Sequence, residues 1–325
     1  MSFPVTYFSI NSELLAPLKP LFIEEEKYRG PKGLFIQGSD RARLLLNELP
    51  TRALAVVGTR RAQNRSLVLV DRVLAAIAPS EPIIIVSGLA RGIDARAHEA
   101  ALSLGLPTIA FLGGGHDPIY PEEHESLRQR ILKADGLVIS EYPLGMPPQP
   151  GLFLRRNRLI ARFSKATWVV EAGYRSGALN TAKEARLANR PVYATVAFPG
   201  DLAFAGNEKL IEAYEPPARP LYSARSLAVE WLTLSSAESS EAGNKGHLGP
   251  LPVTPLAKMA DHVHREQKAR GGITISQLLG WGVTPTGPQE PPVFADPSAF
   301  FETLQQAVEL GLITQENGLL LKKPN

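Results

Sequence analysis

The chain has 325 residues, of which 44% are hydrophobic and 21% charged, with a net charge of +3 and an isoelectric point near 9. This length fits one large domain plus a smaller one, or two medium domains, and the weak positive charge favours an anionic partner. The lack of cysteine excludes disulfides, thiol catalysis and cysteine–zinc sites. The first residues have no signal-peptide pattern and no apolar run is long enough to span a bilayer, so we expect a soluble, cytoplasmic protein.

Short apolar pieces, interrupted by proline and glycine, make up residues 1–50. Residues 30–38 predict a turn and a short strand, and residues 40–49 predict a helix. A segment of this size cannot bury enough surface to fold alone. We therefore expect residues 1–50 to be a short N-terminal extension packed on the next domain.

Residues 51–214 alternate between short apolar runs and stretches of helical periodicity. The runs are nearly continuous and rich in β-branched side chains, as in strands buried on both faces. They lie at 53–57, 83–86, 108–112, 137–139, 166–170 and 191–195. Alternating strands and helices predict an α/β fold, a Rossmann-like doubly wound parallel sheet.

Proline, serine and glycine become frequent in residues 215–268, which predicts a linker, with helices expected at 223–233 and 256–265. Residues 269–325 are more regular. They predict helices at 274–279 and 297–310, then two apolar strands joined at Asn317-Gly318, and therefore a winged-helix-like domain. The second of these helices carries glutamates where a duplex-reading helix needs cations, so we expect this domain to contact protein.

In a doubly wound sheet, ligands bind beyond the carboxyl ends of the strands. Glycine follows most of the predicted strands, either as ordinary turn chemistry or because the backbone approaches a ligand. Because these turns share one edge of the sheet, they predict a binding rim for phosphate groups. Its residues are Gly58, Thr59, Arg60, Arg61, Ser87, Gly88, Arg91, Gly113, Gly114, Ser176 and Gly177.

A block of basic residues spans 153–165 and contains no acidic residue; its cations are Arg155, Arg156, Arg158, Arg162 and Lys165. Clustered cations repel one another unless an anion lies nearby. The strand at 166–170 then leads to a glycine-containing turn and a helix start, whose free amides favour negative charge. The block therefore predicts a cationic lip for a phosphodiester backbone, and the alternative is a solvated helix face.

Six motifs occur in order: 57–60, 87–98, 113–121, 140–143, 153–161, and 170–172 with 176–182. Together they closely resemble the DNA-processing protein A (DprA, also called Smf) family over about residues 33–213. The resemblance implies an extended Rossmann fold that binds single-stranded DNA, forms a homodimer and loads a RecA-type recombinase during natural transformation. It implies neither catalysis nor a cofactor. The family's arginine after the first strand of the core corresponds to Arg60, and its Arg-Asn-Arg segment to Arg156, Asn157 and Arg158.

Two departures from the family pattern concern the rim. Thr59 stands where the family usually has serine, which keeps the hydroxyl. The sequence after Tyr120-Pro121 is Glu-Glu-His-Glu, where some relatives have a basic residue. Three carboxylates would repel phosphate, so we do not expect this loop to contribute to binding.

Two side chains of the 153–165 block have alternative roles. Phe153 either stacks on a base or packs in the core. Arg156 and Arg158 point in different directions from a helix, so at least one of them can be structural, paired with Glu141 or Glu171. We expect those two glutamates, which end adjacent strands, to order the arginines.

Asp94 and His98 lie one helical turn apart, and we expect Asp94 to cap the helix and to orient His98 rather than to serve catalysis. The chain has no Walker A, dinucleotide-binding or nucleophile-elbow motif, and His262 and His264 lack partners at metal spacing, so no metal is expected. The leading hypothesis is a non-enzymatic binder of single-stranded DNA. The alternatives are a nucleotide-binding or phosphoribohydrolase-like enzyme of the same fold, and a nucleotide sensor in bacterial defence.

Overall fold

The chain divides into two compact units, residues 1–232 and 233–325. The computed structural model describes residues 3–22, 30–79, 83–197, 200–213, 215–221, 227, 231, 262, 313–316 and 319–322.

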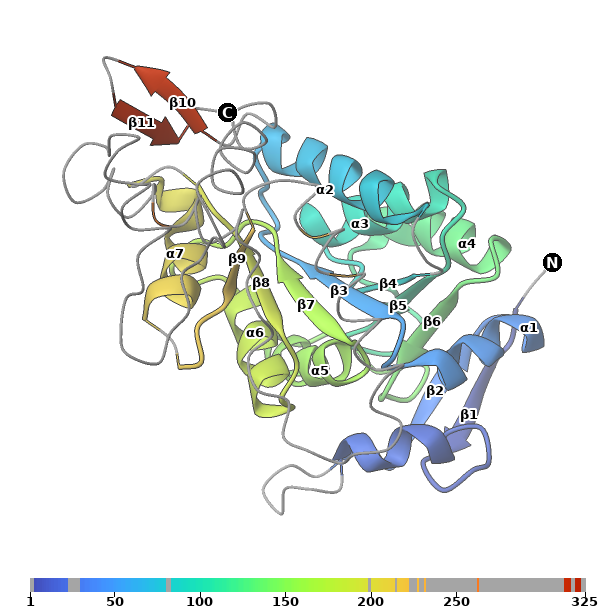
Figure 1. The fold of residues 1–325 in the computed structure, drawn as a ribbon. Coiled ribbons are helices and arrows are strands. Elements are labelled where there is room, and N and C mark those ends of the chain that lie inside the picture. Colours follow the sequence, from blue (N-terminus) through green and yellow to red (C-terminus); the bar gives the residue numbers. More distant parts are fainter. Residues whose placement is uncertain are drawn as a thin grey trace. The chain divides into compact units, whose positions relative to one another are not determined.

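A nine-stranded sheet forms the first unit, in the order β1-β2-β6-β5-β4-β3-β7-β8-β9 (Figure 1). The strands are β1 Val5–Ser9, β2 Gly33–Gln37, β3 Ala53–Val57, β4 Ile84–Ser87, β5 Thr108–Phe111, β6 Leu137–Ser140, β7 Ala166–Val169, β8 Val192–Thr195 and β9 Arg219–Leu221. Strands β3 to β9 pair in parallel, whereas β1 and β2 add antiparallel strands beside β6. The predicted doubly wound α/β fold is confirmed, and each of the six apolar runs forms one of the strands β3 to β8.

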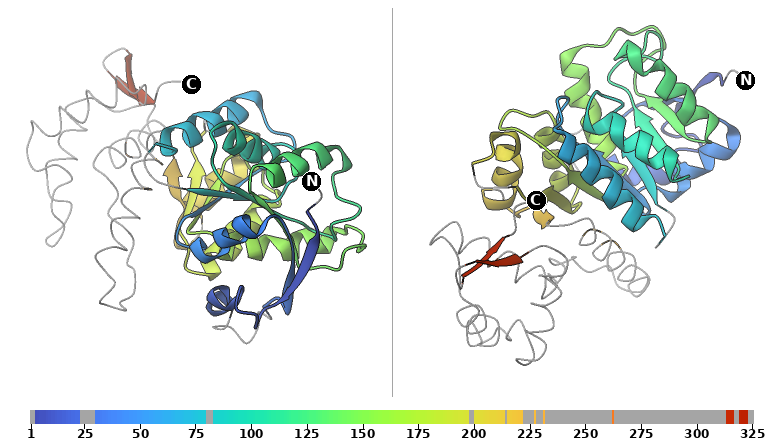
Figure 2. Two further views of the ribbon diagram at one scale, coloured as in Figure 1. Left: turned by 90° about the vertical axis from the view of Figure 1, so that its right-hand side faces the viewer. Right: turned by 90° about the horizontal axis from the view of Figure 1, so that it is seen from above.

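Helices cover both faces of this sheet (Figures 1 and 2). One face carries α2 Asn64–Ile77, α3 Ile93–Ser103 and α4 Glu125–Lys133, and the other carries α5 Pro150–Arg162 and α6 Ala178–Leu187. In β5, Ile109 and Phe111 join the core under α5 and α6, while Ala110 joins the core under α3 and α4. Burial on both faces explains why the strands are apolar at every position.

The N-terminal segment extends the sheet through β1 and β2. Between these strands, the 3₁₀ helix η1 (Ala16–Phe22) follows Leu15, which is buried in the core. The helix expected at 40–49 is a short α1 (Asp40–Arg43), capped by the Ser39 hydroxyl, followed by the 3₁₀ helix η2 (Leu44–Glu48). The segment therefore supplies both strands and core side chains to the unit.

Strand β9 lies within the segment that the sequence assigns to a linker. Pro216, Pro217 and Pro220 favour irregular structure, but β9 is an edge strand beside β8, where a missing backbone N–H is tolerated. It follows η4 (Leu202–Phe204) and α7 (Ala205–Glu212).

In the second unit, β10 (Ile313–Glu316) and β11 (Leu319–Lys322) pair antiparallel, with Ile313 opposite Lys322. The two strands of the predicted hairpin are thus confirmed. The helices predicted at 274–279 and 297–310 lie outside the described residues. The winged-helix-like domain and the domain boundaries at 214 and 268 stay predictions.

Strand β3 lies between β4 and β7, so the chain reverses its direction of travel across the sheet at this point. In open α/β sheets the crevice beyond such a pair of strands is the usual ligand site.

Within the described ranges, no helix has both the length and the apolar content to cross a bilayer.

Candidate nucleic-acid interface

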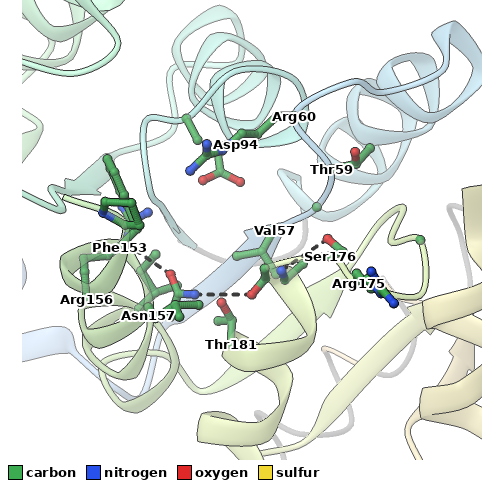
Figure 3. Close-up of a pocket in the computed structure, with 18 of the residues that line it drawn as sticks. Val57, Thr59, Arg60, Asp94, Phe153, Arg156, Asn157, Arg175, Ser176 and Thr181 are labelled. Atoms are coloured by element: carbon green, nitrogen blue, oxygen red, sulfur yellow. Dashed lines mark hydrogen bonds between the residues drawn. The ribbon is translucent and has the colours of Figure 1, made fainter. Parts of the chain in front are cut away.

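A cavity of about 890 Å³ opens beyond the carboxyl ends of β3 and β7. Figure 3 shows Phe153, Arg156 and Asn157 on its α5 side, with Ser176 and Thr181 belonging to the turn before α6 and to α6 itself. The predicted rim residues that line it are Gly58, Thr59, Arg60, Arg61, Phe153, Arg156, Asn157, Ser176 and Gly177. Its lining, as far as the described residues show, does not include Ser87, Gly88, Arg91, Gly113, Gly114, Arg155 and Arg158.

Three exposed arginines line the cavity: Arg60, Arg61 and Arg175. The Arg60 guanidinium carbon lies 5.3 Å from the centre of the Phe153 ring, which holds a cation and an aromatic face side by side. The backbone N–H of Arg61 donates to the Thr59 hydroxyl over 3.2 Å and shapes the turn after β3. These guanidinium groups remain open to solvent and can bind phosphate oxygens in pairs.

Most of the basic block at 153–165 is buried, which corrects the prediction of a cationic lip. Arg156, Arg158, Arg162 and Lys165 are each less than a tenth exposed. Arg162 donates to the carbonyl of Leu21 over 2.9 Å and so ties α5 to the N-terminal segment. A buried cation needs an internal acceptor, and this chain supplies one for each arginine of the set.

Arg156 lines the cavity, but its guanidinium is turned inward and donates to the carbonyls of Gly88, over 2.7 Å, and Phe111. Burial lowers the pKa of Arg156 to about 10; the nearby Asp94 carboxylate opposes this and the Arg60 cation adds to it. The side chain therefore remains charged at neutral pH. It contributes positive potential to the cavity, while its hydrogen bonds serve the loops after β4 and β5.

Arg158 bonds both carboxylate oxygens of Glu141 at 2.6 Å and lies outside the cavity. Burial lowers the Arg158 pKa, and Glu141 opposes the shift. Arg155 is exposed on the same helix, 3.6 Å from Glu141. The expectation that one arginine of this segment is structural and paired with Glu141 agrees with these contacts. Because Arg158 is only 6% exposed and does not line the cavity, it is not placed to bind a phosphate there.

The start of α6 presents free hydrogen-bonding groups to the cavity. The Ser176 hydroxyl accepts from the N–H of Ala178 over 3.3 Å, and the space in front of Gly177 is open. Thr181 is only 2% exposed, yet it lines the cavity and its hydroxyl has no partner within the described part of the chain (Figure 3). Asn157 links α5 to this helix by donating to the carbonyl of Gly177. A helix start with an unused buried hydroxyl suits an anion.

The glycines after β4 and β5 make room for protein side chains, which corrects the expectation that they let backbone approach a ligand. A Cβ at Gly88 would lie 2.5 Å from the Arg156 guanidinium carbon, and one at Gly113 would lie 2.9 Å from Cε1 of Phe153. Gly114 instead packs against backbone, with the Cα of Pro148 3.0 Å from the place a Cβ would take. Among the glycines predicted for the rim, Gly177 is the one with no atom within 4 Å of the place a Cβ would take.

Ser87 and Glu171 also differ from their predicted roles. The Ser87 hydroxyl is fully buried and donates to the carbonyl of Val56, so it cannot bind phosphate. Glu171 is buried and accepts from the N–H of Gln63, which fixes the turn after β3. Glu141 and Glu171 do not end adjacent strands, because β5, β4 and β3 separate β6 from β7.

Asp94 lies inside α3 and accepts from the backbone of Ala90 and Gly88, in the loop after β4, and of Gly58, in the turn after β3, so it fixes two loops beside the cavity. Burial raises its pKa, while Arg156 and these amides oppose the rise. His98 is oriented by Thr108, whose hydroxyl lies 2.7 Å from Nδ1, and not by Asp94. The predicted structural character of both side chains agrees with these contacts, but their proposed link is wrong.

Sequence reasoning missed Arg175, Tyr174 and Thr181. Tyr174 is 64% exposed, lines the cavity, and carries Lys209 4.8 Å from its ring centre. Both Tyr174 and Arg175 lie in the turn after β7, next to Ser176. An aromatic and a cationic residue in this turn, beyond the strands where the chain reverses direction across the sheet, could have indicated that both belong to the site. The sequence contains no signal for Thr181, because a helical threonine that faces a cavity cannot be told from one that faces the core or solvent.

The sequence matches the family model described as DNA recombination-mediator protein A over residues 20–230. The chain belongs to this family. A Mycobacterium tuberculosis protein that carries the name DNA processing protein DprA is 43% identical over 247 residues. The match covers 74% of this chain and 59% of the relative. Protein Smf of Escherichia coli is 40% identical over 178 residues, 55% and 45% of the two chains. The chain thus spans about half of the curated relatives it matches.

Solved structures of the same family share the fold. DNA processing protein A from Streptococcus pneumoniae superposes with a TM-score of 0.59 at 33% identity, covering 70% of this chain and 74% of that one. The Helicobacter pylori protein gives 0.58 at 26% identity, covering 72% and 99%. The latter is described for its single-stranded DNA binding mode.

Proposed function

We propose that this DprA-family chain binds single-stranded DNA in the cavity beyond β3 and β7 and acts as a recombination mediator without catalysis of its own. The observation that carries the proposal is that exposed guanidinium groups, an aromatic face and an open helix start converge on one cavity. Stacking on aromatic rings and cations along the backbone are the means by which proteins hold unpaired strands.

Each group has a part in this proposal. The start of α6, with the Thr181 hydroxyl and Arg175, takes one phosphate. Arg60 and Arg61 bind the next backbone oxygens, and Phe153 and Tyr174 offer faces for bases. Arg156 adds positive charge to the cavity from the protein interior and orders the loops after β4 and β5, without contacting the DNA strand.

Recruitment of a RecA-type recombinase, dimer formation and a role in natural transformation belong to the same proposal. Family membership supports them, since the family is described as recombination mediators. The binding mode described for the Helicobacter pylori relative supports the choice of ligand. We also propose a cytoplasmic location, where such DNA and recombinase meet.

The experiment is a fluorescence-anisotropy titration of labelled oligo-dT with the full chain and with Arg60→Ala and Arg175→Ala. Each loss of a phosphate contact weakens binding and lowers the slope of log affinity against log salt by about 0.7. Arg155→Ala is the matched control, because this arginine is exposed but lies outside the cavity. Equal losses in all three variants would reject the cavity as the binding site, and release of free base from nucleoside monophosphates would favour an enzyme.

A further inference from the structure

A second, smaller hollow adjoins the cavity, and the proposed function does not use it. Arg60, Phe153 and Tyr120 line both spaces, while Arg91 lines only the smaller one. The hollow therefore continues the cavity along the edge of the sheet, toward the loop after β4.

Two guanidinium groups flank two aromatic rings at this hollow. Arg60 lies 5.3 Å from the Phe153 ring centre, the Phe153 and Tyr120 centres are 5.5 Å apart, and the Arg91 guanidinium carbon lies 5.9 Å from the Tyr120 ring. Cations alternating with aromatic faces match the phosphates and bases of a single strand. Arg91 is placed to hold a phosphate one step beyond the one at Arg60.

Arg91 is not free for this task, because Glu123 forms an ion pair with its Nε. Glu123 is held in position by its own turn: the ring of the next residue, His124, lies with Nδ1 2.8 Å from the carbonyl of Leu89, two residues before Arg91. Both side chains of the pair are about half exposed, at 48% and 51%. An exposed ion pair contributes little to stability, because water screens it. Stability therefore does not explain why this pair lies beside the hollow.

We propose that the Arg91 guanidinium, at the rim of this small hollow, is a second phosphodiester position and that Glu123 occupies it until the strand displaces the carboxylate. The inference rests on the proposed function. A phosphodiester oxygen is a charged acceptor like the carboxylate and can take its place on the Arg91 guanidinium. A carboxylate left in place would repel the same phosphate. Glu123 therefore weakens DNA binding, and the loop expected not to contribute acts as a competitor.

The test uses Glu123→Gln, which keeps the shape of the side chain and removes its charge. Glu122→Gln is the control, because Glu122 is exposed on the same turn and loses the same charge without touching Arg91. Oligo-dT of about 20 nucleotides is titrated at about 50, 100 and 200 mM salt with wild type and both variants. The same titrations are repeated in an Arg91→Ala background.

Glu123→Gln is expected to bind roughly 3- to 10-fold more tightly at low salt, because the strand no longer has to displace a carboxylate from Arg91, and the gain should shrink as salt screens that carboxylate. Glu122→Gln gains less, and Glu123→Gln gains nothing once Arg91 is alanine. Equal gains in the two glutamine variants, or a gain that survives without Arg91, would overturn the inference. Arg60→Ala in the same series separates the two claims: if it weakens binding while Glu123→Gln has no effect, only the second position is rejected. A wild type that does not bind rejects both.

Discussion

Arg158 holds both carboxylate oxygens of Glu141 at 2.6 Å, and both side chains are more than nine-tenths buried. The pair joins α5 to the end of β6, so an arginine in the middle of a basic block is part of the protein's interior. Its role in this family member is therefore to position α5, whose first turns form one wall of the cavity.

Removal of Arg158 leaves the buried Glu141 carboxylate with only the exposed Arg155, 3.6 Å away, as a neighbouring cation. We predict that Arg158→Ala lowers the free energy of unfolding by about 3–5 kcal/mol. The double variant Arg158→Met with Glu141→Leu should lose less, because no charge stays buried. Urea unfolding of the single and double variants measures both. A double variant as unstable as the single one would show that the ion pair is not the source of the loss.

Alanine substitutions at two glycines of the rim, Gly88 and Gly177, should affect different properties: the first the stability of the fold, the second DNA binding. Gly88→Ala should destabilise the fold by about 1–3 kcal/mol, because its Cβ overlaps the Arg156 guanidinium. Gly177→Ala has open space in front of it and a helical φ of −62°, so stability should stay or rise by up to about 1 kcal/mol. Binding of oligo-dT by Gly177→Ala should nevertheless weaken, since the methyl group intrudes on the helix start. Unchanged binding would remove Gly177 from the proposed phosphate site.

Tyr174 offers a ring for stacking that is not needed for folding. Tyr174→Ala should weaken oligo-dT binding by about 1–3 kcal/mol if one base stacks there. Because the side chain is 64% exposed, the midpoint of urea unfolding should hardly change. Tyr174→Phe keeps the ring and should bind like the wild type. Loss of binding in the phenylalanine variant would point to the hydroxyl instead of stacking.

Much of the fold could be predicted because burial on both faces leaves a local signal. The apolar runs of β3 to β8 stand out for this reason, whereas β1 and β9 are edge strands with mixed or proline-containing sequences. The two basic residues Arg156 and Arg158 look alike in sequence. Only the fold shows that one meets backbone carbonyls and the other a glutamate.

The candidate site was predicted by location better than by residue. The turn after each strand follows from the parallel sheet, so Arg60, Ser176 and Gly177 could be placed at the edge where the cavity lies, and their contact with DNA stays a prediction. Strand order is not encoded locally, and for this reason Glu141 and Glu171 were placed too close together. The hydroxyl of Ser87 was misassigned because a serine at a strand end can face a ligand or the next strand equally well.

Stability should fall as pH decreases below 6.5, because two histidines are buried in the neutral form. Burial lowers the pKa of His98 to about 3 and that of His116 to about 4. The unfolded chain takes up these protons near pH 6.5, so the stabilisation is complete above that pH and is lost as pH falls toward 4. Each histidine contributes a slope of about 1.4 kcal/mol per pH unit in this window.

The measurement is urea unfolding between pH 7.5 and 4.5, with His116→Gln as the comparison. Gln keeps a donor for the Phe35 carbonyl that His116 Nε2 now contacts at 3.0 Å, and it does not titrate. Its unfolding free energy should depend on pH about half as steeply as that of the wild type. A wild type whose stability is flat from pH 7 to 5 would show that these imidazoles become protonated in the folded protein.

Amide hydrogen exchange with and without oligo-dT tests the central claim most directly, that the strand lies at the cavity and not along the basic face of α5. The account predicts that amides 59–63 and 174–179 exchange more slowly with DNA bound, while amides around Arg162 stay unchanged. Protection confined to other surfaces, with 174–179 unaffected, would contradict it.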